Sequence, residues 1–298
     1  MKSAALKIFI MAAIFLLSVS WIFPQKQGGA LILQEMTWTD VRDYLKTCDM
    51  AIIPLGSTEQ HGPHMPLGTD YYEAMGMSEL ISARTGVVVA PVLLAGYSVY
   101  HSGFQGTLSL KPETMEQVLF ETVEILMKYG FRRFLFFNYH GGNNIVQEKI
   151  IQRINHTTEA MAMAIGHGSP IQRSEGGQFF DWHAGVNETS IMLYLKPELV
   201  KMERAEKPKI HFTPQMKRLR ALSLKYPELM VVWSSLLGTP KETMKGGSSA
   251  ELSSNGIWSF NDPKTAKPEI GEKTVNRMVE AAVKFIEAWK QAGNQEKQ

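Results

Sequence analysis

The chain has 298 residues, of which 44% are hydrophobic and 20% are charged, and its formal net charge is +2 at pH 7. This composition is that of a globular protein that can bury a sizeable core, so a disordered or low-complexity chain is excluded. Lys and Arg form no long run, which argues against a nucleic-acid partner or an acidic membrane surface. We therefore expect a small-molecule substrate that is uncharged or of mixed charge.

The N-terminal segment differs in kind from the rest. Positive charge from Lys2 and Lys7 precedes an almost unbroken apolar run from Ile8 to Phe23. The pattern predicts a secretory signal peptide over residues 1–23, with an uncleaved membrane anchor as the alternative. We therefore expect an exported protein, periplasmic or secreted.

Export implies an oxidising compartment, yet the chain has a single cysteine, Cys48, so no internal disulfide can form. We expect Cys48 to be a small buried or half-buried residue near the first core strand. Residues 25–29 form a short polar linker. No later break in composition and no repeat follows, so residues 30–298 are predicted to be one domain.

The remaining chain alternates short apolar runs with amphipathic stretches. Strands are predicted at 50–55, 87–94, 133–138 and 161–165, and helices at 72–85, 114–129, 144–155 and 274–292. Gly130 follows the second helix where a C′ glycine would stand. The alternation is typical of βαβ units and predicts an α/β protein, a three-layer α/β/α fold with a mainly parallel sheet.

In a parallel sheet, ligands lie at the carboxyl ends of the strands, so polar clusters after apolar runs are the candidate sites. The first is Gly56 to Asp70, GSTEQHGPHMPLGTD, which contains Glu59 and His61. Carboxylate and imidazole ligands in one loop suit zinc, manganese, iron or cobalt, although polar Gly/Pro loops without metal are common. His64 is expected to be a partly exposed loop residue.

The second cluster runs from Asn138 to Asn144, NYHGGNN, and the third from Asp181 to Ser190, DWHAGVNETS. His140 stands at a strand exit before two glycines that allow close backbone approach. His183 and Glu188 can do acid/base chemistry near pH 7, although Glu188 could simply cap the helix that follows. The histidines at 156, 167 and 211 have no acidic or glycine-rich residues beside them, and surface or core packing is expected for them.

Together, the three clusters resemble the creatininase family of metal-dependent amidohydrolases over nearly the whole chain after the signal segment. The Gly-x-x-Glu-Gln-His-Gly loop that ends in Asp and the His-Ala-Gly-x-x-Glu-Thr-Ser run are intact, and Tyr139 replaces a Gly in Asn-Gly-His-Gly-Gly-Asn. Weaker similarities are a Phe-Pro-Gly-Thr-like segment at 97–110, with Gln105 in place of the proline, and a closing segment at 256–271.

The resemblance implies a centre with a divalent metal, zinc or manganese and in some cases iron, with one or two ions per subunit. Its ligands would be Glu59, His61, Asp70 and His140, with Asp70 bridging two ions. In creatinine amidohydrolase a glutamate two residues after the motif histidine helps to hold the second ion, whereas this chain has Gly142. Either Glu188 replaces that ligand, or the enzyme works with one ion.

The expected mechanism is attack of a metal-bound hydroxide on a carbonyl. The second ion or the N–H groups of Gly141 and Gly142 would hold the oxyanion, His183 would pass a proton to the leaving group, and Glu188 would orient it. The residues expected to contact the substrate are Tyr97, His101, Gly141, Gly142 and Trp182.

Creatinine itself is not the expected substrate, because Phe179 stands where creatinine amidohydrolase has a tryptophan that encloses the ring. A cyclic amide or an oxidised cyclic polyol or sugar fits better, with hydrolysis of a non-peptide C–N bond as the predicted reaction. A metal-dependent isomerase or aldolase acting on a ketose, and a non-catalytic exported protein that binds metal or sugar, remain open. By analogy with relatives we expect a homo-oligomer, for which a hexamer is the model.

Overall fold

The computed structural model of the protein describes residues 29–166 and 181–294. The predicted signal peptide or anchor at 1–23 lies outside these residues, as do His167 and Phe179. Within the described ranges, no helix is both long and apolar enough to cross a membrane.

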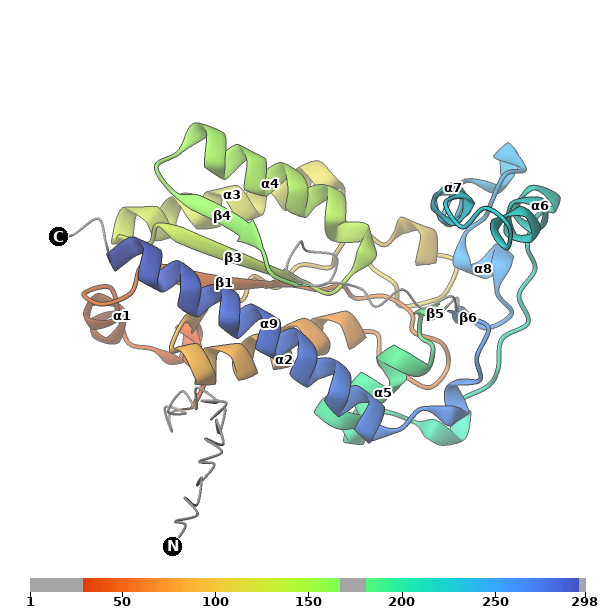
Figure 1. The fold of residues 1–298 in the computed structure, drawn as a ribbon, viewed down its shortest axis with the longest axis horizontal. Helices are drawn as coiled ribbons and strands as arrows, with labels where there is room; N and C mark the ends of the chain where they lie inside the picture. Colours follow the sequence, from red (N-terminus) through yellow and green to blue (C-terminus); the bar gives the residue numbers. More distant parts are fainter. Residues whose placement is uncertain (1–28, 167–180, 295–298) are drawn as a thin grey trace, which may run out of the picture.

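A four-stranded parallel sheet lies at the centre of the molecule (Figure 1). Its strands, in spatial order, are β2 (Val88–Val89), β1 (Met50–Leu55), β3 (Arg133–Asn138) and β4 (Met161–Ala164). β1 and β3 pair along their whole length, from Met50 with Arg133 to Leu55 with Asn138. The two strands therefore end together, and the loops that follow them begin side by side at one edge of the sheet.

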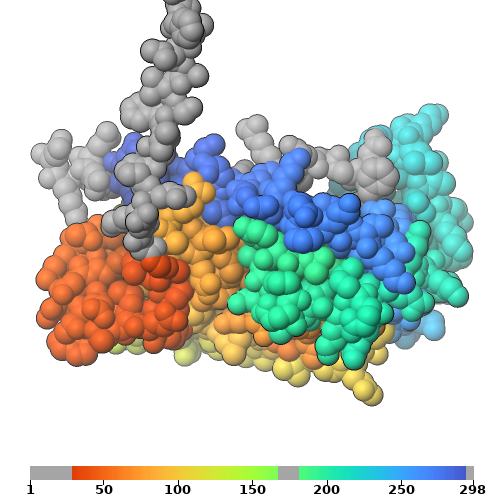
Figure 2. Space-filling view, turned by 90° about the horizontal axis from the view of Figure 1, so that it is seen from below, coloured from red at the N-terminus to blue at the C-terminus, as the bar shows by residue number. Residues whose placement is uncertain are grey.

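Helices cover both faces of this sheet. α3 (Pro112–Tyr129) and α4 (Asn144–Thr157) pack on one face, and α2 (Thr69–Thr85), α5 (Val186–Leu195) and α9 (Pro268–Asn294) on the other (Figure 1). In Figure 2 the blue helix α9 lies along the second face beside α5. Within β1, Ile53 packs toward α3 and α4, and Ile52 toward α2 and α9. The predicted three-layer α/β/α fold is confirmed.

Most predicted elements are present, and three of them differ from the prediction by three residues or more at one end. The strand predicted at 87–94 is only Val88–Val89, because Pro91 has no N–H to continue the ladder. α2 begins at Thr69 rather than residue 72, so Asp70 lies in its first turn. α9 begins at Pro268 rather than residue 274.

Several short elements had no sequence prediction. They are α1 (Trp38–Tyr44), the antiparallel pair β5 (Asp181–His183) and β6 (Trp258–Ser259), α6 (Pro214–Ser223), α7 (Leu229–Ser234) and α8 (Ser249–Leu252). The 3₁₀ helices include η2 (Val99–His101) and η3 (Gly141–Asn143). The helices α6 to α8 pack around a separate apolar cluster at one end of the molecule, beyond β5 and β6 (Figure 1).

Glycine ends α3 as predicted. Gly130 follows Tyr129 with φ of 114°, a left-handed conformation that L side chains rarely adopt, and its N–H bonds the carbonyls of Leu126 and Met127. Cys48 is half-buried, as expected, and the Tyr44 hydroxyl donates to its sulfur at 3.0 Å.

Gly130→Ala should lower the free energy of unfolding by about 1–3 kcal/mol, because the added Cβ strains this backbone conformation. A Cβ at Gly130 would meet only Leu45 Cδ1, at 3.9 Å, so the loss would come from the backbone. Urea denaturation followed by circular dichroism measures it. Gly76→Ala, inside α2 and facing the end of the Leu195 side chain, is the control and should not destabilise. Equal stability of the two variants would show that the left-handed backbone conformation at residue 130 does not require glycine.

Candidate metal centre

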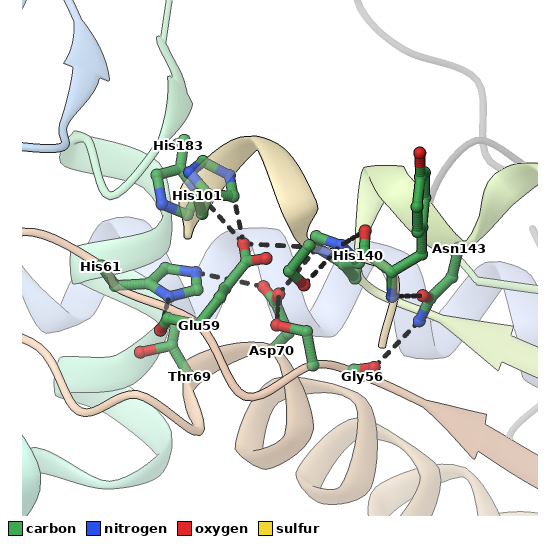
Figure 3. A network of polar contacts seen from close by, with 12 residues as sticks. Gly56, Glu59, His61, Thr69, Asp70, His101, His140, Asn143 and His183 are labelled. Atoms are coloured by element: carbon green, nitrogen blue, oxygen red, sulfur yellow. Dashed lines mark hydrogen bonds and ion pairs between the residues drawn. The ribbon is translucent and has the colours of Figure 1, made fainter. Parts of the chain in front are cut away.

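Seven titratable side chains from six segments converge beyond the ends of β1 and β3, and all of them except Glu188 are labelled in Figure 3. The loop after β1, the first turn of α2, the loop after β3, η2, β5 and the first turn of α5 each contribute. All seven are buried except Glu188, whose side chain is 16% exposed. They are Glu59, His61, Asp70, His101, His140, His183 and Glu188.

Asp70 lies between two histidines and uses a different oxygen toward each. Its Oδ1 is 3.2 Å from His61 Nε2, and its Oδ2 is 3.0 Å from His140 Nδ1. Ser57 Oγ donates to Oδ2 at 2.7 Å and fixes the rotation of the carboxylate. This is the arrangement required of a carboxylate that bridges two cations.

Glu59 faces three ring nitrogens with one oxygen. Its Oε1 lies 3.4 Å from His140 Nδ1, 3.4 Å from His101 Nε2 and 3.6 Å from His183 Nδ1. Neither carboxylate oxygen has a hydrogen-bond partner among the described residues, although the side chain is fully buried. A buried carboxylate in that condition is costly, and a cation beside it would remove the cost.

Backbone carbonyls fix the tautomers of three of these histidines. His61 Nδ1 lies 3.1 Å from Glu59 O, and His140 Nε2 lies 3.0 Å from Tyr97 O. His183 Nε2 lies 2.6 Å from Gln60 O. A carbonyl only accepts, so each of these nitrogens carries the proton, and in the neutral ring the opposite nitrogen is bare. That bare nitrogen faces Glu59 or Asp70 in every case.

A bare nitrogen beside a carboxylate is unfavourable unless a proton or a cation stands between them. Burial alone would lower the pKa of His61, but the charge and hydrogen bond of Asp70, with Glu188 and Glu59, raise it to about 9. Burial also tends to lower the pKa of His140, but the charge of Glu59 helps to raise it well above its usual value. Protons therefore occupy, in the metal-free protein, the positions that a cation would take.

Glu188 completes a second group of ligands. Its Oε2 lies 3.8 Å from His61 Nε2 and accepts a hydrogen bond from Ala184 N at 2.5 Å. Glu188 therefore caps the start of α5 and also lies where it can act as a metal ligand. Burial and the charge of Asp70 raise the pKa of Glu188 to about 8, against the opposing effect of His61.

Ligand atoms within 4.8 Å of one another form three groups: Glu59, Asp70 and His140; His61, His183 and Glu188; and Glu59, His101 and His183. Mixed nitrogen and oxygen donors of this kind suit zinc and manganese. The residues present therefore fit a divalent cation, and Asp70 joins the first group to the second through His61.

Gly142 is not simply a missing ligand. A Cβ there would lie 2.1 Å from Tyr97 O and 2.6 Å from His140 Nε2, so no side chain fits. A Cβ at Gly141 would meet nothing within 4 Å. The backbone at residue 142 lies too close to the carbonyl that binds His140 for a glutamate to fit there. Glu188 instead provides a carboxylate in the second group of ligands.

A cavity of about 330 Å³ opens onto the centre. Of the predicted substrate residues, His101, Gly141, Gly142 and Trp182 line it. Tyr97 does not line the cavity. Its side chain packs on the apolar cluster between the sheet and the helices α3 and α4, and its carbonyl binds His140. Lining residues that had no sequence prediction are Tyr100, Tyr139, Asn144, Ser234, Leu237 and Trp258.

His64 was predicted wrongly. It is 1% exposed, and its Nε2 lies 2.9 Å from Thr189 Oγ1, because the loop after β1 runs beneath α5. The backbone of Lys201 also donates to His64 O at 2.7 Å. His156 and His211 are exposed, as expected.

Comparison with known proteins gives a consistent result. A family model described as creatinine amidohydrolase matches residues 34–286. The 3-dehydro-scyllo-inosose hydrolase of Thermotoga maritima is 34% identical over 186 residues, 58% of this chain and 58% of that protein. The mycofactocin precursor peptide peptidase of Mycolicibacterium smegmatis is 30% identical over 255 residues, 80% of this chain and 85% of that protein.

Solved structures show the same fold. A mutant creatininase described as Zn-Zn type has a TM-score of 0.65 at 23% identity, covering 87% of this chain and 98% of its own. A structure titled creatininase Mn has a TM-score of 0.63 at 22% identity, covering 86% and 97%.

The affinity for zinc or manganese should rise with pH, because the cation must displace protons. Without a cation the pKa of His61 is about 9, that of Glu188 is about 8 and that of His140 is well above its usual value, so affinity should rise up to at least pH 9 and most steeply below pH 8. Each displaced proton contributes about a tenfold change per pH unit. Calorimetric titration of the metal-free protein at several pH values measures this.

Ligand variants provide the control. Glu59→Ala and His140→Ala should each lose metal in elemental analysis of the purified protein, and the exposed His156→Ala should keep it. Full metal content in the first two would contradict the centre.

Gly142→Ala should weaken metal binding by about tenfold or more, because the new methyl displaces the His140 ring. Gly141→Ala is the matched control, with the same added group in open space, and should keep its metal. The affinities can be compared by competition with a chromophoric chelator. Equal affinities would mean that the backbone at 142 does not hold His140 in place.

Proposed function

The chain belongs to the creatininase family, and we propose that it is a metal-dependent hydrolase acting on a small neutral cyclic substrate. The observation that carries this proposal is the set of three histidines, each anchored on a carbonyl, whose bare nitrogens face Glu59 and Asp70 beside a cavity. The titles of two structural neighbours name Zn and Mn, and we assign the same ions here.

Glu59, Asp70 and His140 would hold one cation, and His61, Asp70 and Glu188 a second. When bound, such cations lower the pKa of coordinated water and polarise a carbonyl. His183 Nδ1 is bare and points toward Glu59, so it can accept a proton and then deliver it to the leaving group. Burial and the nearby His61 lower the pKa of His183, which keeps the ring neutral in the metal-free protein.

The cavity favours a neutral ring over an anion. Among its described lining residues there is no Lys or Arg to pair with a phosphate or carboxylate. Tyr100, Trp182 and Trp258 offer aromatic faces, and Ser234 and Asn144 offer hydrogen bonds. These features support a cyclic amide or an oxidised cyclic polyol or sugar. Exclusion of creatinine still depends on Phe179, outside the described residues.

Hydrolysis of a peptide amide is the second candidate. It is favoured by the similarity to the mycofactocin precursor peptide peptidase, which extends over 80% of this chain. A non-peptide substrate is therefore part of the proposal and awaits its test.

Screening the zinc- and manganese-loaded protein against cyclic amides, lactones, oxidised inositols and short peptides should give hydrolysis of a cyclic compound. His183→Ala should keep its metal and lose about 10²–10⁴-fold in kcat, because the proton acceptor is gone. Product formation is followed by mass spectrometry, with His156→Ala as the control. Cleavage of peptides alone would favour the second candidate, and turnover without uptake of water would favour an isomerase or aldolase.

A further inference from the structure

The Gln60 side chain lies between two histidines of the centre and is held in one orientation. Its Oε1 accepts from Gly62 N at 3.0 Å, and its Nε2 donates to Gly256 O at 3.0 Å. The same Nε2 lies 3.1 Å from His101 Nδ1 and 3.0 Å from His183 Nε2. The amide is fixed by a backbone donor at one end and a backbone acceptor at the other, so it cannot be reversed.

The second amide hydrogen of Gln60 decides the tautomer of His101. His183 Nε2 already carries a proton, which it gives to Gln60 O at 2.6 Å, so it cannot accept another. The remaining acceptor is His101 Nδ1, which must therefore be bare. In the neutral ring the proton then lies on Nε2, and Nε2 is the nitrogen that lies 3.4 Å from Glu59 Oε1.

Other contacts hold the His101 ring in this position. The Ser249 hydroxyl, in the first turn of α8, lies in hydrogen-bonding contact with Nδ1. The ring stacks on His183 with centroids 4.0 Å apart and contacts Tyr100 at 4.5 Å. Figure 3 shows His101 and His183 side by side, with dashed lines from both to the Glu59 carboxylate below them. Burial and the neighbouring histidines lower the pKa of His101, consistent with a neutral ring.

His101 thus differs from the other three histidines, whose bare nitrogens face the carboxylates. The group Glu59, His101 and His183 has the spacing of a cation site. It presents an N–H where a ligand would need a lone pair.

We propose that His101 is a positioning residue, whose protonated Nε2 lies 3.4 Å from Glu59 Oε1 and orients that carboxylate electrostatically for the cation beside His140. It takes no cation itself. The inference rests on the proposed metal centre. It implies that α8 also helps to hold the centre in place, through the contact of Ser249 with His101. It also limits the centre to two cations per chain.

The tautomer can be read directly by ¹⁵N NMR of the zinc-loaded protein labelled at histidine, with His101→Phe to identify the signals. We expect a protonated Nε2 and a bare Nδ1 for His101. The opposite pattern would overturn the proposal. This measurement uses neither turnover nor a substrate, so it stands even if the proposed reaction is wrong.

Metal binding provides the second measurement. His101→Phe keeps the ring stacking and removes the donor, so it should bind two equivalents of zinc with affinity about 10- to 100-fold weaker than wild type. His101→Asn serves as a second variant if the first folds poorly, and His156→Phe is the matched control. Loss of an equivalent in both His101 variants, or unchanged affinity in both, would refute the positioning role. A wild-type protein that binds no metal would instead refute the proposed function.

Discussion

The structure depends on one electrostatic constraint, which is that buried carboxylates and bare imidazole nitrogens face one another without enough protons to join them all. Glu59 is fully buried and neither of its oxygens makes a hydrogen bond among the described residues, and Asp70 touches two histidines. Such an arrangement costs several kcal/mol unless positive charge enters it. The pKa values of His61 and His140 are raised for the same reason, because a proton on each ring supplies positive charge beside the carboxylates. A divalent cation supplies that charge better, because it binds several lone pairs at once.

The fold meets this constraint by pairing β1 with β3 along their full length. Tyr139 N continues the ladder to Leu55 O at 3.0 Å, and Asn143 Nδ2 donates to Gly56 O at 2.9 Å. The two loops are therefore fastened together at the point where they leave the sheet. A Cβ at Gly56 would lie 2.5 Å from Tyr71 Cα, so the start of α2 also packs directly on this junction. Asp70 is brought to His140 by backbone geometry and not by long flexible side chains.

The sequence predicted the parts of the site whose evidence is local. Glu59, His61 and Asp70 stand close together in the sequence after an apolar strand, and His140 follows the next buried strand, so the parallel-sheet rule brings them together. Residues that depend on distant contacts were missed or misjudged. Ser249 lies in α8, which has 4 residues, and Trp258 lies in β6, which has 2, and elements this short show no readable period in the sequence. The burial of His64 depends on Thr189, which no pattern around residue 64 indicates.

Glu73 shows how the charge of the centre is balanced. It lies one turn after Asp70 in α2, is fully buried, and has no hydrogen-bond partner for either oxygen among the described residues. Burial first, then the charges of Glu188 and Asp70, raise its pKa well above the usual value. In the metal-free protein this shift favours the neutral acid form of Glu73, which would leave Glu59, Asp70 and Glu188 as the carboxylates available to a cation. With two divalent cations bound, these three carboxylates would leave one net positive charge, which would favour an anionic nucleophile and a developing oxyanion. An ionised Glu73 would cancel that charge, so its burial without a hydrogen-bond partner among the described residues supports the chemistry of the centre.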